Sequence, residues 1–197
     1  MSVQLWIKKW EDRSLGFHQE EVEPLLVKFS PFLPKVPVLV PLCGKSKDMI
    51  WLRDQGHSVI GIEASPIACR EFFSENNISN VKMSKQGDFQ VYSADRIQIY
   101  CGDFFQLALH DLPHFSGVYD RAALIALDSQ SRRTYAKKIT ELVLAQNAPT
   151  PVPYLLIALE YNPGKIKGPP YSVTSGEIRD LYGKGFDISP LLKERDV

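Results

Sequence analysis

The stretch VLVPLCGKSKDMIWL, residues 38–52, decides the fold of this chain. The apolar run at 36–42 predicts a strand that is buried on both faces, as in a parallel sheet. Residues 45–55 predict a helix that ends before Gly56. The turn that joins them contains one glycine, Gly44. In α/β proteins a ligand lies at such a strand-to-helix turn, so this turn is the first candidate site.

Strand and helix patterns alternate on both sides of this stretch. Residues 79–88 are polar and predict a loop, and the SRR segment at 131–133 predicts an ordinary solvated start of a helix. Thr174 and Glu177 have the spacing of a capping box. Alternation of this kind predicts a single domain over 1–197 with a doubly wound, Rossmann-like parallel sheet. The predicted strands lie at 57–64, in two segments of 89–105 that turn near Ala94 and Asp95, at 115–120 and at 154–161. The predicted helices lie at 20–29, 66–76 and 129–146, with a further one in IRDLYG, residues 178–183, after the capping box.

Bulk composition excludes several classes of protein. Lysine plus arginine and aspartate plus glutamate both number 23, so the formal net charge is zero. A nucleic-acid-binding or membrane-surface protein normally carries an excess of basic residues, so neither partner is expected. No apolar run is long enough to span a bilayer, and the N-terminal stretch does not resemble a signal peptide. The three cysteines lack disulfide or zinc spacing, so we expect no metal and a cytoplasmic location.

Acidic side chains follow the predicted strands at one edge of the sheet. Glu63 ends the second strand, 19 residues after Gly44, where a carboxylate can accept hydrogen bonds from both ribose hydroxyls of a nucleoside cofactor. Asp103 and Phe104 follow the next parallel strand and offer a carboxylate beside an aromatic surface, which suits an adenine ring. Arg121 ends a further strand at the same edge. Glu63 and Asp103 could equally be ordinary exposed loop carboxylates.

The turn after the first strand lacks the G-x-G-x-x-G fingerprint of dinucleotide-binding proteins. A pyrophosphate needs several close backbone N–H groups at a free helix N-terminus, whereas Leu42 and Cys43 add bulk there. A nucleoside without phosphates is the better fit, and S-adenosyl-L-methionine is such a ligand.

Four separated motifs then carry a resemblance. VPLCGKSKDMIWLRDQGHSVIGIEAS closely resembles the corresponding region of the thiopurine S-methyltransferase family. WIKKWEDRSLGFHQE near the start, YDRAALIAL after the fourth parallel strand and YNPGKIKGPPYSVTSGEIRDLYG near the end agree in the same order. The chain is identified as resembling a compact, bacterial-type member of this family.

The resemblance implies a class I methyltransferase sheet, S-adenosyl-L-methionine as methyl donor and S-adenosyl-L-homocysteine as product. It implies thiopurines and other aromatic or heterocyclic thiols as acceptors, with selenium or tellurium compounds as a further possibility. Its implied site residues are Trp10, Leu42, Glu63 and Arg121 for the cofactor, Asp103 and Phe104 for the adenine, and Phe17 with the loop residues Pro170 and Tyr171 for the acceptor.

Arg121 is the candidate catalytic residue, because a guanidinium can stabilise a thiolate or guide the loss of its proton. Most of the catalysis is expected from positioning and desolvation. Two alternatives stay open, a non-catalytic S-adenosylmethionine-binding protein and a nicotinamide-dependent Rossmann reductase. The missing glycine fingerprint weighs against the reductase.

The two ends of the chain carry separate expectations. Residues 1–34 are expected to form an N-terminal helical arm that closes over the site as a lid. The family continues into a final antiparallel strand, and this strand is expected to be missing here. The strand at 154–161 would then be an exposed edge. We expect a monomer, with an oligomer possible through this edge unless FDISPLL, residues 186–192, fills the slot.

Overall fold

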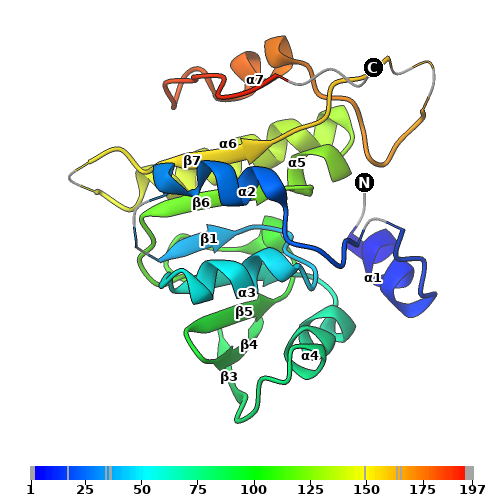
Figure 1. Ribbon diagram of the computed structural model, residues 1–197, viewed down its shortest axis with the longest axis vertical. Coiled ribbons are helices and arrows are strands. Elements are labelled where there is room, and N and C mark those ends of the chain that lie inside the picture. Colours follow the sequence, from blue (N-terminus) through cyan, green and yellow to red (C-terminus); the bar gives the residue numbers. More distant parts are fainter. Residues whose placement is uncertain are drawn as a thin grey trace.

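The computed structural model describes residues 3–16, 18–33, 35, 37–148, 150–162, 164 and 166–193. Its centre is a seven-stranded sheet with the order β3-β4-β5-β2-β1-β6-β7 (Figure 1). The strands are β1 (Val38–Val40), β2 (Val59–Glu63), β3 (Lys82–Gln86), β4 (Phe89–Ala94), β5 (Ile97–Cys101), β6 (Gly117–Arg121) and β7 (Tyr154–Ile157).

The sheet is mixed, where the sequence predicted a parallel one. β1, β2, β5, β6 and β7 are parallel, whereas β4 pairs antiparallel with both β3 and β5. The loop predicted at 79–88 was therefore wrong, since β3 lies inside it. All five residues of β3 are exposed, so it lacks the apolar alternation by which a half-buried strand is recognised.

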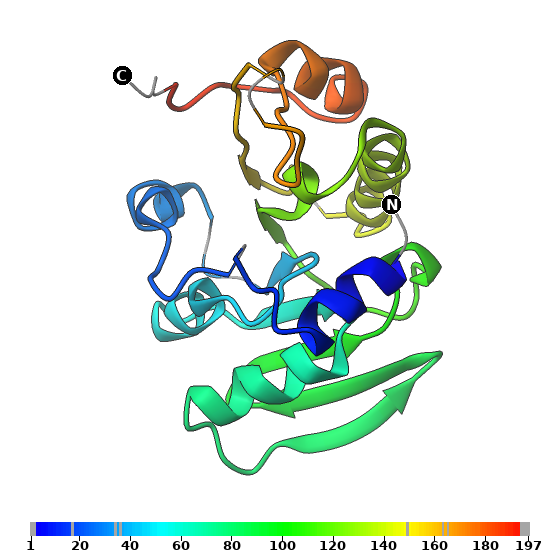
Figure 2. The same ribbon diagram turned by 90° about the vertical axis from the view of Figure 1, so that its right-hand side faces the viewer.

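Helices cover both faces of the sheet (Figure 2). α3 and α4 pack on one face around Leu52 and Phe72, and α5, α6 and α7 contribute to the core on the other face. The helices are α1 (Val3–Glu11), α2 (Pro24–Phe29), α3 (Lys47–Asp54), α4 (Pro66–Glu75), α5 (Ala123–Ala126), α6 (Ser129–Leu144) and α7 (Ser175–Tyr182), with short 3-10 turns η1 (Ser30–Phe32) and η2 (Phe104–Gln106).

Local capping explains where the helices begin. The side chain of Ser46 accepts from the N–H of Asp48, and that of Ser65 accepts from Ala68 with Pro66 in the first turn. Thr174 caps α7 by accepting from the N–H of Glu177, as the capping-box spacing predicted. These caps start α3 and α4 directly after β1 and β2, which leaves only short turns at the carboxyl ends of the strands.

Two segments that are remote in sequence lie at that end of the sheet. Figures 1 and 2 show α1 and the loop between β7 and α7 there.

β7 is the last strand of the sheet, and residues 183–193 form no further strand, so FDISPLL does not extend it within the described residues. A partner on this edge stays a prediction.

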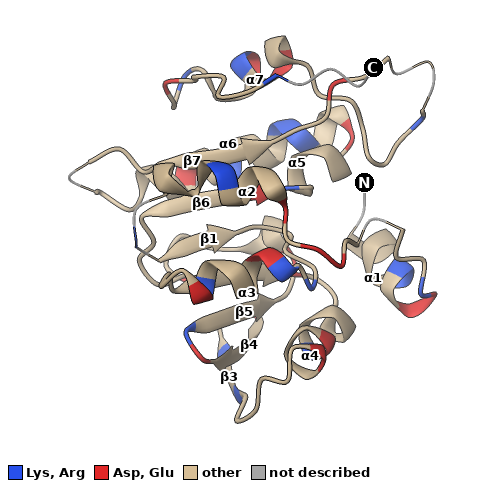
Figure 3. Ribbon diagram, viewed as in Figure 1, with Lys and Arg blue, Asp and Glu red and all other residues tan. Residues whose placement is uncertain are grey.

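The surface and the helices agree with the balanced composition. Acidic and basic positions are interspersed over the helices in Figure 3, with no face of one sign in that view. No helix within the described part of the chain has the length and apolar character needed to cross a membrane.

Candidate functional site

Strained backbone marks the carboxyl ends of β1 and β6. Leu42 follows β1 with a φ of 47° and Gly44 follows at 54°, while Ala122 follows β6 at 69°. The backbone of a residue with a Cβ rarely adopts this left-handed conformation, and the residues that do adopt it concentrate at functional sites. β1 and β6 are neighbours in the sheet, so both strained turns belong to one place.

Glu63 joins the ends of β2 and β1. Its Oε2 accepts from the N–H of Gly44 at 2.9 Å, and its Oε1 accepts from the N–H of Ser65 at 2.7 Å. Burial raises the pKa of this carboxyl, which is 6% exposed, and the N–H groups of Ser65 and Gly44 oppose that rise. Each oxygen keeps a second lone pair, so Glu63 is oriented by the backbone and can still accept hydrogen bonds from a ligand.

The N-terminal arm packs on the turn after β1. The indole of Trp10, on α1, is buried, and a Cβ on Gly44 would lie 3.4 Å from it. Lys45 Nζ lies 5.9 Å from the centre of the Trp10 ring. The same ammonium donates to Glu75 at 2.6 Å and to Glu71 at 3.2 Å. The predicted cofactor-binding residue Trp10 therefore lies beside the turn and close to Lys45, which α4 holds in place.

The two residues predicted to bind adenine differ in burial, since Asp103 is half-buried and Phe104 lies in the core. Asp103 begins η2, and its Oδ1 accepts from the N–H of Phe105 at 2.9 Å. The Phe104 ring is 1% exposed and lies 5.0 Å from the ring of Tyr135. Asp103 thus lies at the predicted edge of the sheet, whereas the Phe104 ring belongs to the core beneath it.

Arg121 lies at the end of β6 between two carboxylates. Its Nε is 3.6 Å from Glu23 and its Nη1 is 3.7 Å from Asp48, with the side chain 12% exposed. Asp48 is fully buried and already accepts from the Tyr119 hydroxyl at 2.8 Å and from the N–H of Glu23 at 2.8 Å. Both contacts of Arg121 exceed hydrogen-bond length, so its N–H groups can still bind a ligand.

The preceding residue, Asp120, belongs to a different kind of arrangement. Its Oδ2 accepts from the hydroxyls of Tyr135 at 2.6 Å and Tyr154 at 2.7 Å. The Tyr154 and Tyr182 hydroxyls are 3.1 Å apart. Burial raises the pKa of Asp120, which is fully buried, and the Tyr135 and Tyr154 hydroxyls oppose that rise. This network ties β6 to α6, β7 and α7.

The acceptor loop predicted around Pro170 and Tyr171 lies against α5. The N–H of Tyr171 donates to the carbonyl of Ile125 at 2.7 Å, and the Tyr161 hydroxyl donates to the carbonyl of Pro170. The loop is therefore fixed against α5, which follows β6 in the chain. Phe17, the other predicted acceptor contact, lies outside the described residues.

Arg132 corrects the prediction of a solvated helix start at 131–133. The residue is 6% exposed, and its Nε donates to Glu177 at 2.7 Å. Its Nη1 donates to the carbonyl of Leu127 at 3.0 Å, and its guanidinium carbon lies 6.0 Å from the centre of the Tyr171 ring. The sequence missed it because Ser131 and Arg133 beside it are polar and the partners lie elsewhere in the chain.

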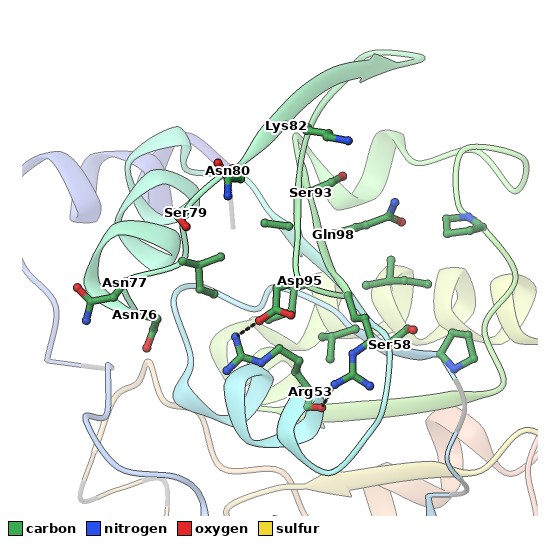
Figure 4. A pocket seen from close by; sticks show the side chains of 18 of the residues that line it. Arg53, Ser58, Asn76, Asn77, Ser79, Asn80, Lys82, Ser93, Asp95 and Gln98 are labelled. Carbon is green, nitrogen blue, oxygen red and sulfur yellow. Dashed lines mark hydrogen bonds and ion pairs between the residues drawn. The ribbon is translucent and has the colours of Figure 1, made fainter.

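A hollow of about 940 Å³ lies at the opposite end of the sheet (Figure 4). Ser58 and Arg96 line it just before β2 and β5, so it lies at the amino ends of these strands. Arg53 in this hollow already pairs with Asp95 at 2.8 Å. In a sheet of this type ligands lie at the carboxyl ends of the strands. The position of the hollow therefore counts against it despite its volume, and the candidate site is the one that contains Glu63 and Arg121.

Solved structures of other proteins share the fold of this chain. A magnesium protoporphyrin IX methyltransferase from Synechocystis with bound S-adenosylhomocysteine has a TM-score of 0.60 at 13% identity, covering 93% of this chain and 89% of its own. A 1,6-didemethyltoxoflavin-N1-methyltransferase from Burkholderia thailandensis has a TM-score of 0.57 at 14% identity, covering 93% and 75%. Both show the fold of class I methyltransferases.

The sequence comparisons are more specific. A thiopurine S-methyltransferase of Pseudomonas fluorescens is 40% identical over 200 residues, which cover 100% of this chain and 88% of the relative. One from Pseudomonas syringae is 43% identical over 192 residues, which cover 96% and 84%. The family model for thiopurine S-methyltransferase matches residues 1–197. The chain therefore belongs to the thiopurine S-methyltransferase family.

Proposed function

We propose that this protein transfers the methyl group of S-adenosyl-L-methionine to the sulfur of a thiopurine or of another aromatic or heterocyclic thiol. The observation that carries the proposal is the Glu63 carboxylate, which the N–H groups of Gly44 and Ser65 hold at the turn after β1. A carboxylate at this place suits the two ribose hydroxyls of a nucleoside. Family membership and the names of the relatives support the same reaction.

The chain's own residues fit this cofactor. Glu63 would accept from the ribose, and Leu42 and Trp10 would contact the cofactor from the turn and the arm. Asp103 would accept from the adenine, and Phe104, whose ring lies in the core, supports the η2 backbone at that place. When bound, the cofactor supplies an electrophilic methyl group on a sulfonium.

The acceptor side is built by other elements. We assign Phe17, Pro170 and Tyr171 to the walls of the acceptor pocket and Arg121 to the reacting sulfur. The guanidinium would stabilise the thiolate and orient it toward the methyl group. Its charge is partly balanced by Glu23 and Asp48 at 3.6 and 3.7 Å, so it would attract the thiolate while staying fixed in place. Positioning of this kind supplies most of the acceleration of a simple displacement.

The cysteines support the proposal of a cytoplasmic location. Cys43, Cys69 and Cys101 are buried free thiols, which supports a reducing cytoplasm. We expect a small-molecule acceptor in solution as the only substrate besides the cofactor.

The test is a methylation screen with calorimetry. Aromatic thiols, thiopurines, selenite and tellurite are each supplied with S-adenosyl-L-methionine, and methylated products are identified by mass spectrometry. Turnover is expected with the aromatic thiols. Tight cofactor binding without turnover on any acceptor would favour a non-catalytic binding protein, and binding of a nicotinamide cofactor instead would contradict the proposal.

A further inference from the structure

We propose that Arg132 is a positioning residue for the acceptor loop, residues 168–171, and that it sets the affinity for the acceptor. The inference rests on the proposed function, because it takes the loop as a wall of the acceptor pocket. It assigns no contact between Arg132 and the acceptor. Arg132 acts instead through the ring of Tyr171.

The burial of Arg132 calls for a physical reason. A guanidinium that is 6% exposed near the start of a helix has lost most of its hydration. Glu177 and the carbonyl of Leu127 recover part of this cost with hydrogen bonds of 2.7 and 3.0 Å. The guanidinium carbon also lies over the Tyr171 ring, 6.0 Å from its centre. A planar cation held by two bonds in its own plane is well placed to support an aromatic ring.

Gly168 of the same loop also lies against the Tyr171 ring. A Cβ on Gly168 would lie 2.4 Å from this ring, and Gly168 has a φ of 76°. Glycine is therefore required at this position both for space and for conformation. The tip of the loop closes on its own tyrosine, and Arg132 lies against that tyrosine from the helix.

The stem of the loop is held independently of Arg132. The N–H of Val173 donates to the carbonyl of Leu159 at 2.8 Å. The Ser172 hydroxyl donates to the carbonyl of Tyr161 at 2.8 Å and accepts from its N–H at 2.9 Å. The backbone of the tip is bonded through the N–H of Tyr171 to Ile125 and through the carbonyl of Pro170 to the Tyr161 hydroxyl, and Arg132 adds support to the Tyr171 ring. Loss of Arg132 should thus loosen this ring, weaken the bond from Tyr171 to Ile125 and leave the stem in place.

A purely structural role makes a different prediction. Arg132 also joins α6 to α7 through Glu177, so its loss could act by separating the two helices. In that case Glu177→Gln, which weakens the ion pair and leaves the guanidinium beside Tyr171, should reproduce the effect of Arg132→Leu. If Arg132 positions the loop, Glu177→Gln should keep an acceptor KM near that of the wild type.

The experiment compares Arg132→Leu with Arg133→Leu, an exposed neighbour on the same helix. We expect Arg132→Leu to raise the KM for an aromatic thiol about tenfold, with the Kd for S-adenosyl-L-methionine unchanged by calorimetry. Arg132→Lys should raise the KM by an intermediate amount, because an ammonium keeps the positive charge but lacks the planar set of N–H donors of a guanidinium. Arg133→Leu should match the wild type. An equal rise in the KM for the thiol and in the Kd for S-adenosyl-L-methionine would overturn the proposal, and so would an unchanged KM.

Hydrogen exchange separates this inference from the proposed function. The amide of Tyr171 should exchange faster in Arg132→Leu than in the wild type, while that of Val173 in the stem should not change. This readout needs no turnover. If the wild type methylates no thiol, the proposed function fails and exchange still tests the support of the loop. If the wild type is active and exchange at Tyr171 is unaltered, only the role of Arg132 is wrong.

Discussion

Two buried carboxylates lie at or next to the ends of two strands of this sheet, and they differ in whether side chains donate to them. Glu63 on β2 accepts from two backbone N–H groups. Asp120 on β6 accepts from the N–H of Leu124 on its Oδ1 and, in addition, from two tyrosine hydroxyls on its Oδ2. Burial raises the pKa of both. Glu63 keeps 6% exposure and Asp120 has none.

This difference distinguishes a carboxylate that can bind a ligand from a carboxylate that stabilises the fold. Backbone donors hold Glu63 in place and occupy one lone pair on each oxygen, so a ligand can use the others. The hydroxyls that reach Asp120 come from α6 and β7, so that carboxylate fixes elements to one another. A carboxylate at the carboxyl end of a strand is therefore not by itself a ligand site, because its donors decide which role it has.

The largest effect should follow Asp120→Ala. This change leaves the Tyr135 and Tyr154 hydroxyls buried without their acceptor, which should cost about 3 kcal/mol of unfolding free energy. Urea denaturation measures it, with the exposed Asp180→Ala as the matched control. A variant with full stability and lost cofactor affinity would reverse the roles assigned to the two carboxylates.

Glu63→Ala should act on binding instead. The ribose hydroxyls would lose a charged acceptor worth about 1.5–3 kcal/mol, so the Kd for S-adenosyl-L-methionine should rise about tenfold to a hundredfold. Glu63→Asp should be intermediate, since it keeps the charge and shortens the reach. Calorimetry on the folded variants decides, with Glu141→Ala as the exposed control. Unchanged affinity would remove the ribose assignment.

Arg121 tests the comparison further, because it follows Asp120 directly and we propose that it contacts the ligand. Arg121→Ala should lower kcat with thiol acceptors about tenfold or more and change the cofactor Kd less, if its charge acts at the sulfur. Arg121→Lys should recover part of kcat. The opposite pattern, with affinity lost and turnover intact at saturating cofactor, would make Arg121 a cofactor contact only. Steady-state kinetics and calorimetry on the same preparations separate the two.

Local patterns in the sequence predicted the parts of the fold that depend on neighbours in the chain. The apolar runs predicted β1 and β2, and the serine and threonine caps predicted the starts of α4 and α7. The edge strand β3 was missed because its residues are exposed on both faces. Its Lys82 and Lys85 are typical of an edge that avoids pairing.

For the candidate site, the order of strands and helices in the sequence predicted the position in the sheet but not the contacts of each side chain. The ends of parallel strands predicted that Leu42, Glu63, Asp103 and Arg121 share one edge of the sheet. The sequence did not separate Asp120 from them, because its partners Tyr135 and Tyr154, and Tyr182 that pairs with Tyr154, come from three other elements. The burial of Arg132 was missed for the same reason, since contacts between distant segments leave no local pattern.

The smallest effect concerns pH and Glu63. Because burial raises its pKa in the folded protein above the ordinary value of about 4.3, the carboxyl takes up its proton at a higher pH than in the unfolded chain. The ribose hydroxyls bind the ionised form, so cofactor affinity should fall as the pH falls through the raised pKa. Glu63→Gln should remove this dependence, and calorimetry from pH 8 down to pH 5 measures it.

The stability of the cofactor-free protein should change in the opposite direction. Between the unfolded and the folded pKa the folded protein binds more protons, so the contribution of Glu63 to stability decreases as the pH rises through that interval. Acidification should therefore strengthen the fold slightly while it weakens cofactor binding. Asp120 should show the stability dependence without the affinity dependence, because it is fully buried. If Asp120→Asn altered the pH dependence of cofactor affinity as Glu63→Gln does, the two carboxylates would share one role and the comparison would fail.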